Sequence, residues 1–99
     1  MKMAFIVHNE HQTDHVMGLL NAAQIDYYTR WDRTTGKGHG TEPHLGTGAY
    51  SSTNAVLMIG FEDEVALDTL IEKIKAANAQ IVRAPDRIRL FQLPLERVV

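Results

Sequence analysis

The chain of 99 residues contains no cysteine. That absence excludes disulfide bonds, zinc sites built from thiolates and catalysis by a cysteine nucleophile, and it fits either redox compartment. Long apolar runs are also missing, because the longest, AVLMIGF at 55–61, falls far short of the roughly 20 residues that cross a bilayer. The first residues carry no cleavage pattern of a signal peptide. We therefore expect one cytoplasmic domain at 1–99, with no part embedded in a membrane.

A strong excess of charge of either sign is missing as well. Lysine and arginine number 10 and aspartate and glutamate 12, which leaves a formal net charge of -2. These charges are scattered along the chain, so no long-range field steers the protein to DNA or RNA. We expect no nucleic-acid partner. The hydrophobic content of 44% and charged content of 22% are ordinary for a globular domain.

Apolar periodicity predicts six elements in the order strand, helix, strand, strand, helix, strand. This order is the split βαβ pattern of an α+β ferredoxin-like sandwich, in which two helices cover one face of a four-stranded antiparallel sheet. The expected bounds are a strand at 1–7, a helix capped by Thr13 or Asp14, strands at 26–33 and 54–61, a helix from a cap at Asp63 to about Asn78, and a strand at 88–94.

The second face of such a sheet is left uncovered in a single chain. The second strand would place either Tyr27, Thr29 and Trp31 or Tyr28 and Arg30 on that face. Large aromatic side chains on a bare sheet are commonly covered by another subunit. We therefore expect self-association, most simply into a ring.

Five of the seven glycines lie in the stretch GKGHGTEPHLGTGAYSST at 36–53, between the second and third strands. A connection of this length inside a compact domain is usually functional or disordered, and a passive flexible tip has a similar composition. Lys37 lies between two glycines, where an ammonium group and backbone N–H groups can meet an anion, although the spacing is not that of a P-loop. The loop also holds further groups that bind ligands or proteins, namely His39, Glu42, His44 and Tyr50.

The element order, this long connection and the runs YYTRWDRTTGKGHGTE and NAVLMIGFEDEV resemble the PII family of trimeric signalling proteins. The resemblance covers roughly residues 1–74. It implies a homotrimer with effector sites in the clefts between subunits, and a regulatory role, as in nitrogen regulation, in place of enzymatic activity. The partner it implies is a target protein such as a transporter or an enzyme, which the large loop engages.

The resemblance also implies residue roles. In the nucleotide-binding members of the family, one group of positions lies beside the adenine nucleotide and another flanks its base. The matching residues here are Thr29, Gly36, Lys37 and Gly38 for the first group, and Phe61 and Glu62 for the second. The loop would present Glu42, His44 and Tyr50 to the partner protein, and Tyr50 lies roughly where some members are covalently modified.

The segment after the second helix departs from the family pattern. ATP-binding members have a glycine-rich loop with a lysine at this point, whereas residues 76–99 here contain no glycine. Arg83, Arg87 and Arg89 can supply positive charge to phosphates. The effector is therefore left open between an adenine nucleotide and a small anion.

The histidines suggest an alternative function. His39 and His44 on the loop form one candidate metal pair, while His11 and His15, four residues apart, would share a face if the first helix began early enough. His8 lies close by in the sequence. CutA, another trimeric ferredoxin-like family, is associated with divalent cations, so the alternative is a CutA-like divalent-metal-binding trimer. No nucleophile and base stand at the spacing of a catalytic pair, so we expect no enzyme.

The loop itself is expected to respond to the ligand. Its glycines allow the backbone more than one shape, and an anion held by Lys37 can select one of them. Ordering such a segment costs on the order of 1 kcal/mol or more per residue, which the effector or a partner must supply. We expect an arm that is mobile when empty and takes a defined shape when the effector is bound.

Overall fold

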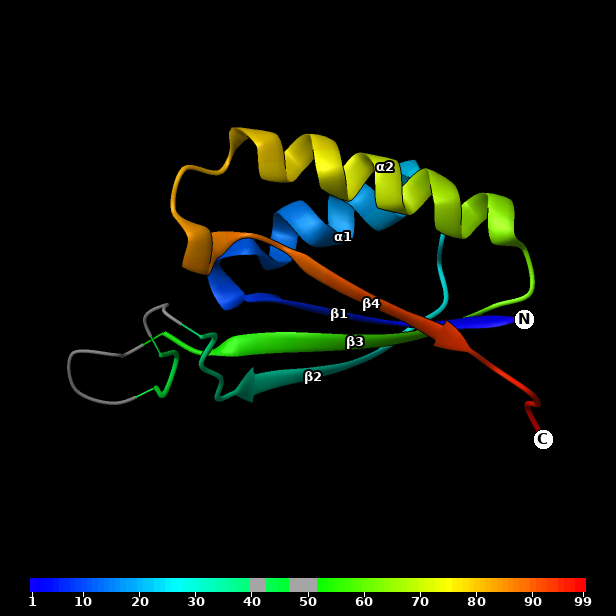
Figure 1. The fold of residues 1–99 in the computed structure, drawn as a ribbon, viewed down its shortest axis with the longest axis horizontal. Coiled ribbons are helices and arrows are strands. Elements are labelled where there is room, and N and C mark those ends of the chain that lie inside the picture. Colours follow the sequence, from blue (N-terminus) through cyan, green and yellow to red (C-terminus); the bar gives the residue numbers. More distant parts are fainter. Residues whose placement is uncertain (40–42, 47–51) are drawn as a thin grey trace.

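Within residues 1–39, 43–46 and 52–99, which the computed structural model describes, four strands form one antiparallel sheet and two α-helices lie on one of its faces (Figure 1). The strand order is β2-β3-β1-β4, so β1 and β3 are central. The expected α+β ferredoxin-like fold is therefore confirmed. The elements are β1 (Lys2–Asn9), the short 3-10 helix η1 (Glu10–Gln12), α1 (Thr13–Ala22), β2 (Thr29–Thr34), β3 (Asn54–Phe61), α2 (Glu64–Gln80), the 3-10 helix η2 (Ala84–Asp86) and β4 (Arg89–Pro94).

The helix starts show one correct and one wrong expectation. Asp63 caps α2 as predicted, because its carboxylate accepts a hydrogen bond from the N–H of Val65 at 2.8 Å. The cap position of α1 is Gln12, so the prediction of a cap at Thr13 or Asp14 was wrong. The Thr13 hydroxyl instead donates to the carbonyl oxygen of Glu10, which belongs to the 3-10 turn that precedes the helix.

The second strand begins at Thr29, three residues later than the predicted 26–33. Tyr27 lies outside the sheet and packs edge-on against Phe61, with ring centroids 6.1 Å apart and an interplanar angle of 69°. The aromatic residues at this point favoured a strand in the prediction, but Tyr27 instead contacts Phe61 at the end of β3. The third strand occupies the predicted residues 54–61.

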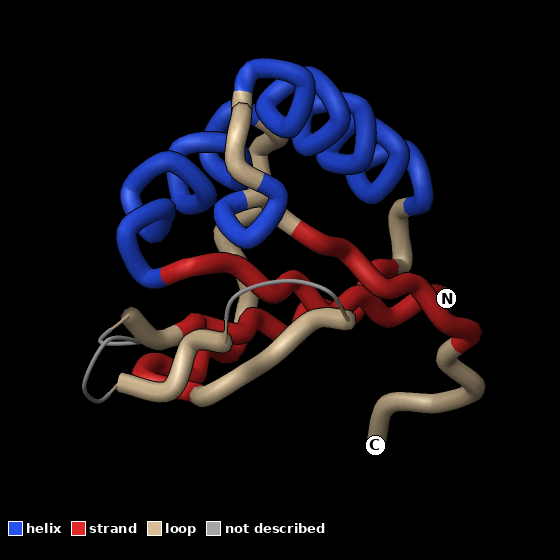
Figure 2. The backbone as a smooth tube through the Cα atoms, turned by 60° about the vertical axis from the view of Figure 1, so that its left-hand side comes forward, coloured by secondary structure: helices blue, strands red, loops and turns tan. Residues whose placement is uncertain are grey.

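The helices form a layer over one face of the sheet (Figure 2). The hydrophobic core lies between the two layers. Alternate side chains of β1 and β3 face the helices, and the apolar stripes of α1 and α2 pack on them. Full burial of one such side chain contributes about 1.5–3 kcal/mol relative to an exposed one. Fully or almost fully buried members are Ala4, Ile6, Val16, Leu20, Leu57, Ile59, Phe61, Leu67, Leu70 and Ile88.

The second face of the sheet is open in the single chain. Thr29 pairs with Met58 and Trp31 pairs with Val56, so these side chains share the face opposite the buried Leu57 and Ile59. Trp31 is 46% exposed, and Phe91 on β4 is 49% exposed. Of the two arrangements that the sequence left open, the structure selects the one with Thr29 and Trp31 on this face.

The link between α2 and β4 is held by one side chain. The Asn78 carboxamide donates to the carbonyl oxygen of Ile88 at 2.7 Å and accepts from the N–H of Ile88 at 2.8 Å. The paired hydrogen bonds imitate a rung of a β-ladder. They secure the segment that carries Arg87 and Arg89 beside the end of β1. In the part of the chain that is described, no helix has both the length and the apolar character to cross a bilayer.

Candidate functional site

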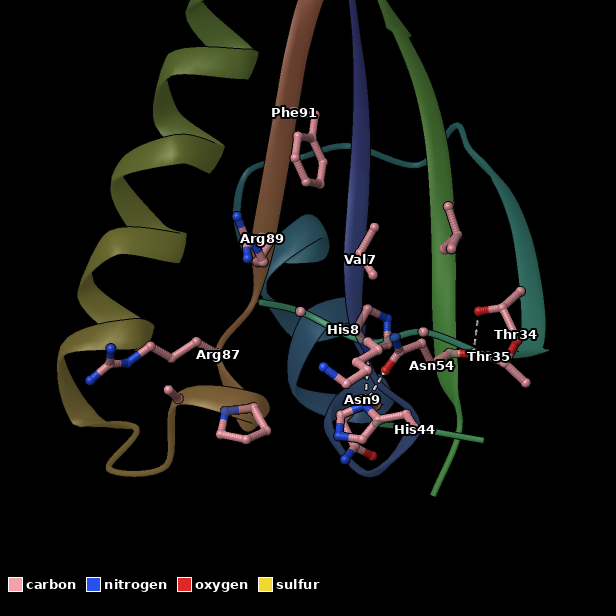
Figure 3. Close-up of a pocket in the computed structure, with 16 residues that line it drawn as sticks. Val7, His8, Asn9, Thr34, Thr35, His44, Asn54, Arg87, Arg89 and Phe91 are labelled. Atoms are coloured by element: carbon pink, nitrogen blue, oxygen red, sulfur yellow. Dashed lines mark hydrogen bonds between the residues drawn. The ribbon is translucent and has the colours of Figure 1, made fainter. Parts of the chain in front are cut away.

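A cavity of about 430 Å³ lies at the end of the sheet where β1 and β2 finish and β3 and β4 begin (Figure 3). Its walls come from Asn54 and Val56 on β3 and from four other parts of the chain. They are the end of β1 around Asn9, the first loop residues at 34–38, the return of the loop at His44, and the segment from Ala84 to Phe91. The cavity therefore forms at the base of the glycine-rich loop.

The charges around this cavity are of one sign. Among its described lining residues, Lys37, Arg87 and Arg89 are cations and none is a carboxylate. The chain as a whole carries a formal net charge of -2, so the charge around the cavity is opposite in sign to the net charge of the protein. A concave site with one sign of charge concentrates ligands of the opposite sign. The cavity is suited to an anion.

The loop closes on itself at the wall of the cavity. Gly36 donates to the carbonyl oxygen of His44 at 2.8 Å, and His44 donates to that of Gly36 at 2.6 Å. The His44 ring donates through Nδ1 to Oδ1 of Asn54 on β3. Its side chain is consequently buried in the site, with the residue only 8% exposed. Both legs of the loop thus meet at the cavity.

A side chain at Gly36 would meet the carboxamide of Asn54. A Cβ atom built there would lie 2.6 Å from Nδ2 of Asn54, a distance that forces the amide to move. We expect Gly36→Ala to displace Asn54 and to release His44, lowering the affinity for anions about 5- to 10-fold by removing a wall of the cavity. Calorimetric titration with inorganic pyrophosphate would measure this. Gly18→Ala is the matched control, since nothing lies within 4 Å of a Cβ at Gly18; equal affinity in both variants would contradict the role of Gly36.

Glu10 forms hydrogen bonds with both ends of the loop, at Arg33 and at Thr53. Its backbone N–H donates to the carbonyl oxygen of Thr53 at 2.9 Å, and its Oε1 accepts from the Thr53 hydroxyl at 2.6 Å. The same oxygen accepts from the backbone N–H of Arg33. Arg33 lies where the β2–β3 register shifts between Trp31 and Thr34, and its φ is +56°. This left-handed conformation is costly for any residue other than glycine. The sequence alone does not identify Glu10 as a contact of the loop, because its partners are 23 and 43 residues away.

The Glu10 contacts make the loop base sensitive to acid. The hydrogen bond from Thr53 is the main cause that lowers the pKa of Glu10 below 4.5, and the N–H of Arg33 adds to it. A carboxylate with a depressed folded pKa stabilises the fold above its unfolded pKa and loses this effect as the pH falls through the folded pKa. We expect Glu10→Gln to lower the melting temperature above about pH 4.5 and the difference from wild type to shrink below that pH. A difference that is constant across the acid range would contradict the assignment.

The N-terminal histidines do not gather into a metal site. His8 is 2% exposed, its Nδ1 donates to the carbonyl oxygen of Asn9 at 2.8 Å, and its Nε2 has no hydrogen-bond partner in the described structure. Burial lowers the pKa of His8, which favours the neutral ring. His11 lies in η1 before the helix, while His15 bonds to Gln12 at 3.0 Å. The described residues contain no group of three or more His, Cys, Asp or Glu side chains placed to hold a metal ion.

The residues expected to bind a ligand divide into two sets. Gly36, Lys37 and Gly38 line the cavity, and so does His44, which was expected to contact a partner protein or a metal ion. Thr29 lies further along the open face at the start of β2, exposed Glu62 follows β3, and Phe61 is fully buried in the core. None of these last three is among the described lining residues.

The other candidate residues of the loop differ in how exposed they are to solvent. His39 is exposed, whereas His44 is buried against Asn54, and Glu42 and Tyr50 lie outside the described residues. The cavity wall also contains residues that were not predicted from the sequence, among them Val7, Asn54, Val56 and Phe91. Strand alternation marks the odd residues of β1 as one face, but only the pairing of strands shows that this face meets the loop.

Comparison with known proteins supports the fold. No family model matches the chain, and no curated protein matches it by sequence. The structure of CPII from Thiomonas intermedia K12 bound to ADP and bicarbonate superposes with a TM-score of 0.68 at 16% identity, covering 97% of this chain and 88% of CPII. A structure of CPII described as a nitrogen regulatory PII-like protein, bound to ADP, AMP and bicarbonate, gives 0.65 at 19% identity with the same coverage. The chain therefore has the fold of these PII-like proteins.

Proposed function

We propose that the protein is a PII-like regulatory protein that binds an anionic effector, an adenine nucleotide or a small anion, in the cavity at the loop base. The observation that carries the proposal is that Lys37, Arg87 and Arg89 all line one cavity, which has no carboxylate among its described lining residues. The similar structures of CPII hold ADP with bicarbonate, or ADP and AMP with bicarbonate, which supports this class of effector.

The placement of the cavity supports a regulatory role. Its wall contains Gly36 and His44, so a bound anion contacts the isolated bridge that these two residues form within the loop. An effector that prefers one arrangement of this bridge shifts the loop toward that arrangement by its difference in affinity. The loop then presents a surface to a target protein, such as a transporter or an enzyme, in one state only.

The open face of the sheet supports assembly into a homotrimer. Trp31, Phe91 and Leu93 are each at least 40% exposed on the face that the helices leave free. A second and third copy covering these side chains would remove apolar surface from water and place neighbouring chains beside the cavity. Light scattering after size exclusion would test the trimer; a monomer at the concentrations used for binding would contradict this part of the proposal.

Calorimetric titration tests the effector. We expect ADP, AMP or bicarbonate to bind the full chain and to raise its melting temperature, because a ligand that binds only the folded state stabilises it. Hydrogen exchange of the Gly36 and His44 amides should slow in the presence of a ligand that binds. Lack of binding by all three, together with inorganic pyrophosphate, would overturn the proposed function. Binding that leaves both amides unchanged would contradict the coupling to the loop.

A further inference from the structure

The ring of His44 has one nitrogen in use and one that is open. Its Nδ1 donates to Oδ1 of Asn54 on β3, and both residues line the cavity (Figure 3). The ring makes no other hydrogen bond to the part of the chain that is described. The one side-chain nitrogen that is sealed from solvent without a partner, among the described residues, is Nε2 of His8. Nε2 of His44 is therefore accessible, and a ligand in the cavity can reach it.

The hydrogen bond to Asn54 fixes which nitrogen of His44 carries the proton. A carboxamide oxygen only accepts, so the neutral imidazole holds its single proton on Nδ1. Nε2 then presents a lone pair. The backbone of Asn54 is held by its pairing with Asn9 across β1 and β3 and by the Thr34 hydroxyl, which donates to its carbonyl oxygen at 2.8 Å. The fold therefore positions a hydrogen-bond acceptor at Nε2.

An acceptor in a cationic cavity discriminates among anions. Lys37 follows Gly36, the bridge partner of His44, so the lysine and the imidazole lie on neighbouring backbone segments of the wall. An anion attracted by the cations brings oxygens that are themselves acceptors, and an oxygen without a proton is repelled by the lone pair of Nε2. An anion that keeps one hydroxyl avoids this conflict, because its O–H donates to Nε2 while its other oxygens face the cations.

A metal ion also coordinates an imidazole lone pair, but the composition of the wall disfavours it. The cations that line the cavity repel a further positive ion. Carboxylates, which would offset that charge, are missing from the lining residues that the structure describes. The lone pair is thus better suited to a hydroxyl group than to a metal.

We propose that His44 makes the cavity specific for oxyanions that carry a hydroxyl group, and that its Nε2 accepts the hydrogen bond from that hydroxyl. The proposal rests on the proposed function, because it names the class of anion at the same site. Hydrogencarbonate and hydrogen phosphate belong to this class. Nitrate and sulfate have the matching shapes and charges without the O–H. The contact also reaches the loop, because the backbone of His44 pairs with Gly36.

Two pairs of anions test the proposal at about pH 8, where an ordinary histidine is neutral. Titrations followed by NMR would compare hydrogencarbonate with nitrate and hydrogen phosphate with sulfate on the full chain. We expect the hydroxyl-bearing member of at least one pair to bind about 5- to 20-fold more tightly, because it gains a hydrogen bond and avoids an unpaired acceptor. A preference confined to the planar pair would identify hydrogencarbonate as the ligand, and one confined to the tetrahedral pair would identify hydrogen phosphate.

Substitutions of His44 separate selectivity from damage to the fold. His44→Phe keeps a ring and removes both nitrogens, so the preference within each pair should disappear while nitrate and sulfate bind within about twofold of wild type. His44→Gln can donate to Asn54 through its amide nitrogen and accept through its amide oxygen, so it should keep at least about half of the preference. His15→Phe, the same substitution at an exposed position of α1, is the matched control and should behave as wild type.

The nitrogen-15 spectrum of the His44 ring gives a direct measurement. We expect the proton on Nδ1 in the empty protein, and a change of the Nε2 signal with the hydroxyl-bearing anions but not with nitrate or sulfate. A proton on Nε2 in the empty protein would overturn the proposal. Equal affinities within both pairs, or an equal loss of both members of each pair in His44→Phe, would also overturn it and leave the anion site standing. Lack of binding by all four anions, ADP and pyrophosphate would overturn the proposed function as well.

Discussion

A double variant, Lys37→Gln with Arg87→Gln, is expected to lower the affinity for both ADP and pyrophosphate at least about 100-fold, because each lost charge-assisted hydrogen bond contributes about 1.5–3 kcal/mol. The two cations come from the loop base and from the segment before β4, and both are among the residues that line the cavity. Calorimetric titration at low and at moderate salt would measure the loss. The dependence of affinity on salt should become shallower, since fewer charges pair with the ligand.

The matched control removes two cations far from this cavity. Lys73→Gln with Arg97→Gln makes the same change of net charge, and neither residue is among the described lining residues. We expect this protein to bind ADP within about twofold of wild type, since surface charges beyond a Debye length of about 10 Å are screened. A comparable loss in both double variants would mean that the net charge, and not the cavity, governs binding.

Phe61→Ala is expected to lower the free energy of unfolding by about 3–5 kcal/mol, the usual cost of truncating a fully buried phenylalanine. Phe61 is 0% exposed and packs against the ring of Tyr27 at the end of β3. This loss is a large fraction of the roughly 5–15 kcal/mol by which small domains are stable. Chemical denaturation followed by circular dichroism would measure it, and a loss below about 1 kcal/mol would contradict the burial of this side chain.

A milder variant separates the core role of Phe61 from the base-flanking role that the family resemblance implies. Phe61→Leu keeps most of the buried volume, and we expect it to retain the fold with a modest loss of stability. If Phe61 acts only in the core, ADP affinity should stay within about twofold of wild type. A tenfold loss of ADP affinity with an unchanged melting temperature would support contact with the base instead.

The sequence by itself was sufficient for the order of the elements and for the third strand at 54–61. Alternation and helical spacing depend on near neighbours in the chain, and so does the Asp63 cap, whose partner is Val65. The glycine pattern also drew attention to Gly36, Lys37 and Gly38, which line the cavity. These features are local, so they can be recognised without knowing what lies across the sheet.

Only the tertiary structure decided which residues share the site. Arg87 and Phe91 reach the loop base because β4 pairs with β1, and a pattern within β4 carries no record of that partner. The Glu10 carboxylate accepts hydrogen bonds from Arg33 and Thr53, which are 23 and 43 residues away in the chain. Arg33 has a left-handed backbone conformation, and because it is not a glycine the sequence gives no sign of it. The burial of Phe61 likewise follows from the helices that cover β3. Residue type and spacing determine the elements, whereas the direction of each side chain and its distant neighbours arise only when the sheet is assembled.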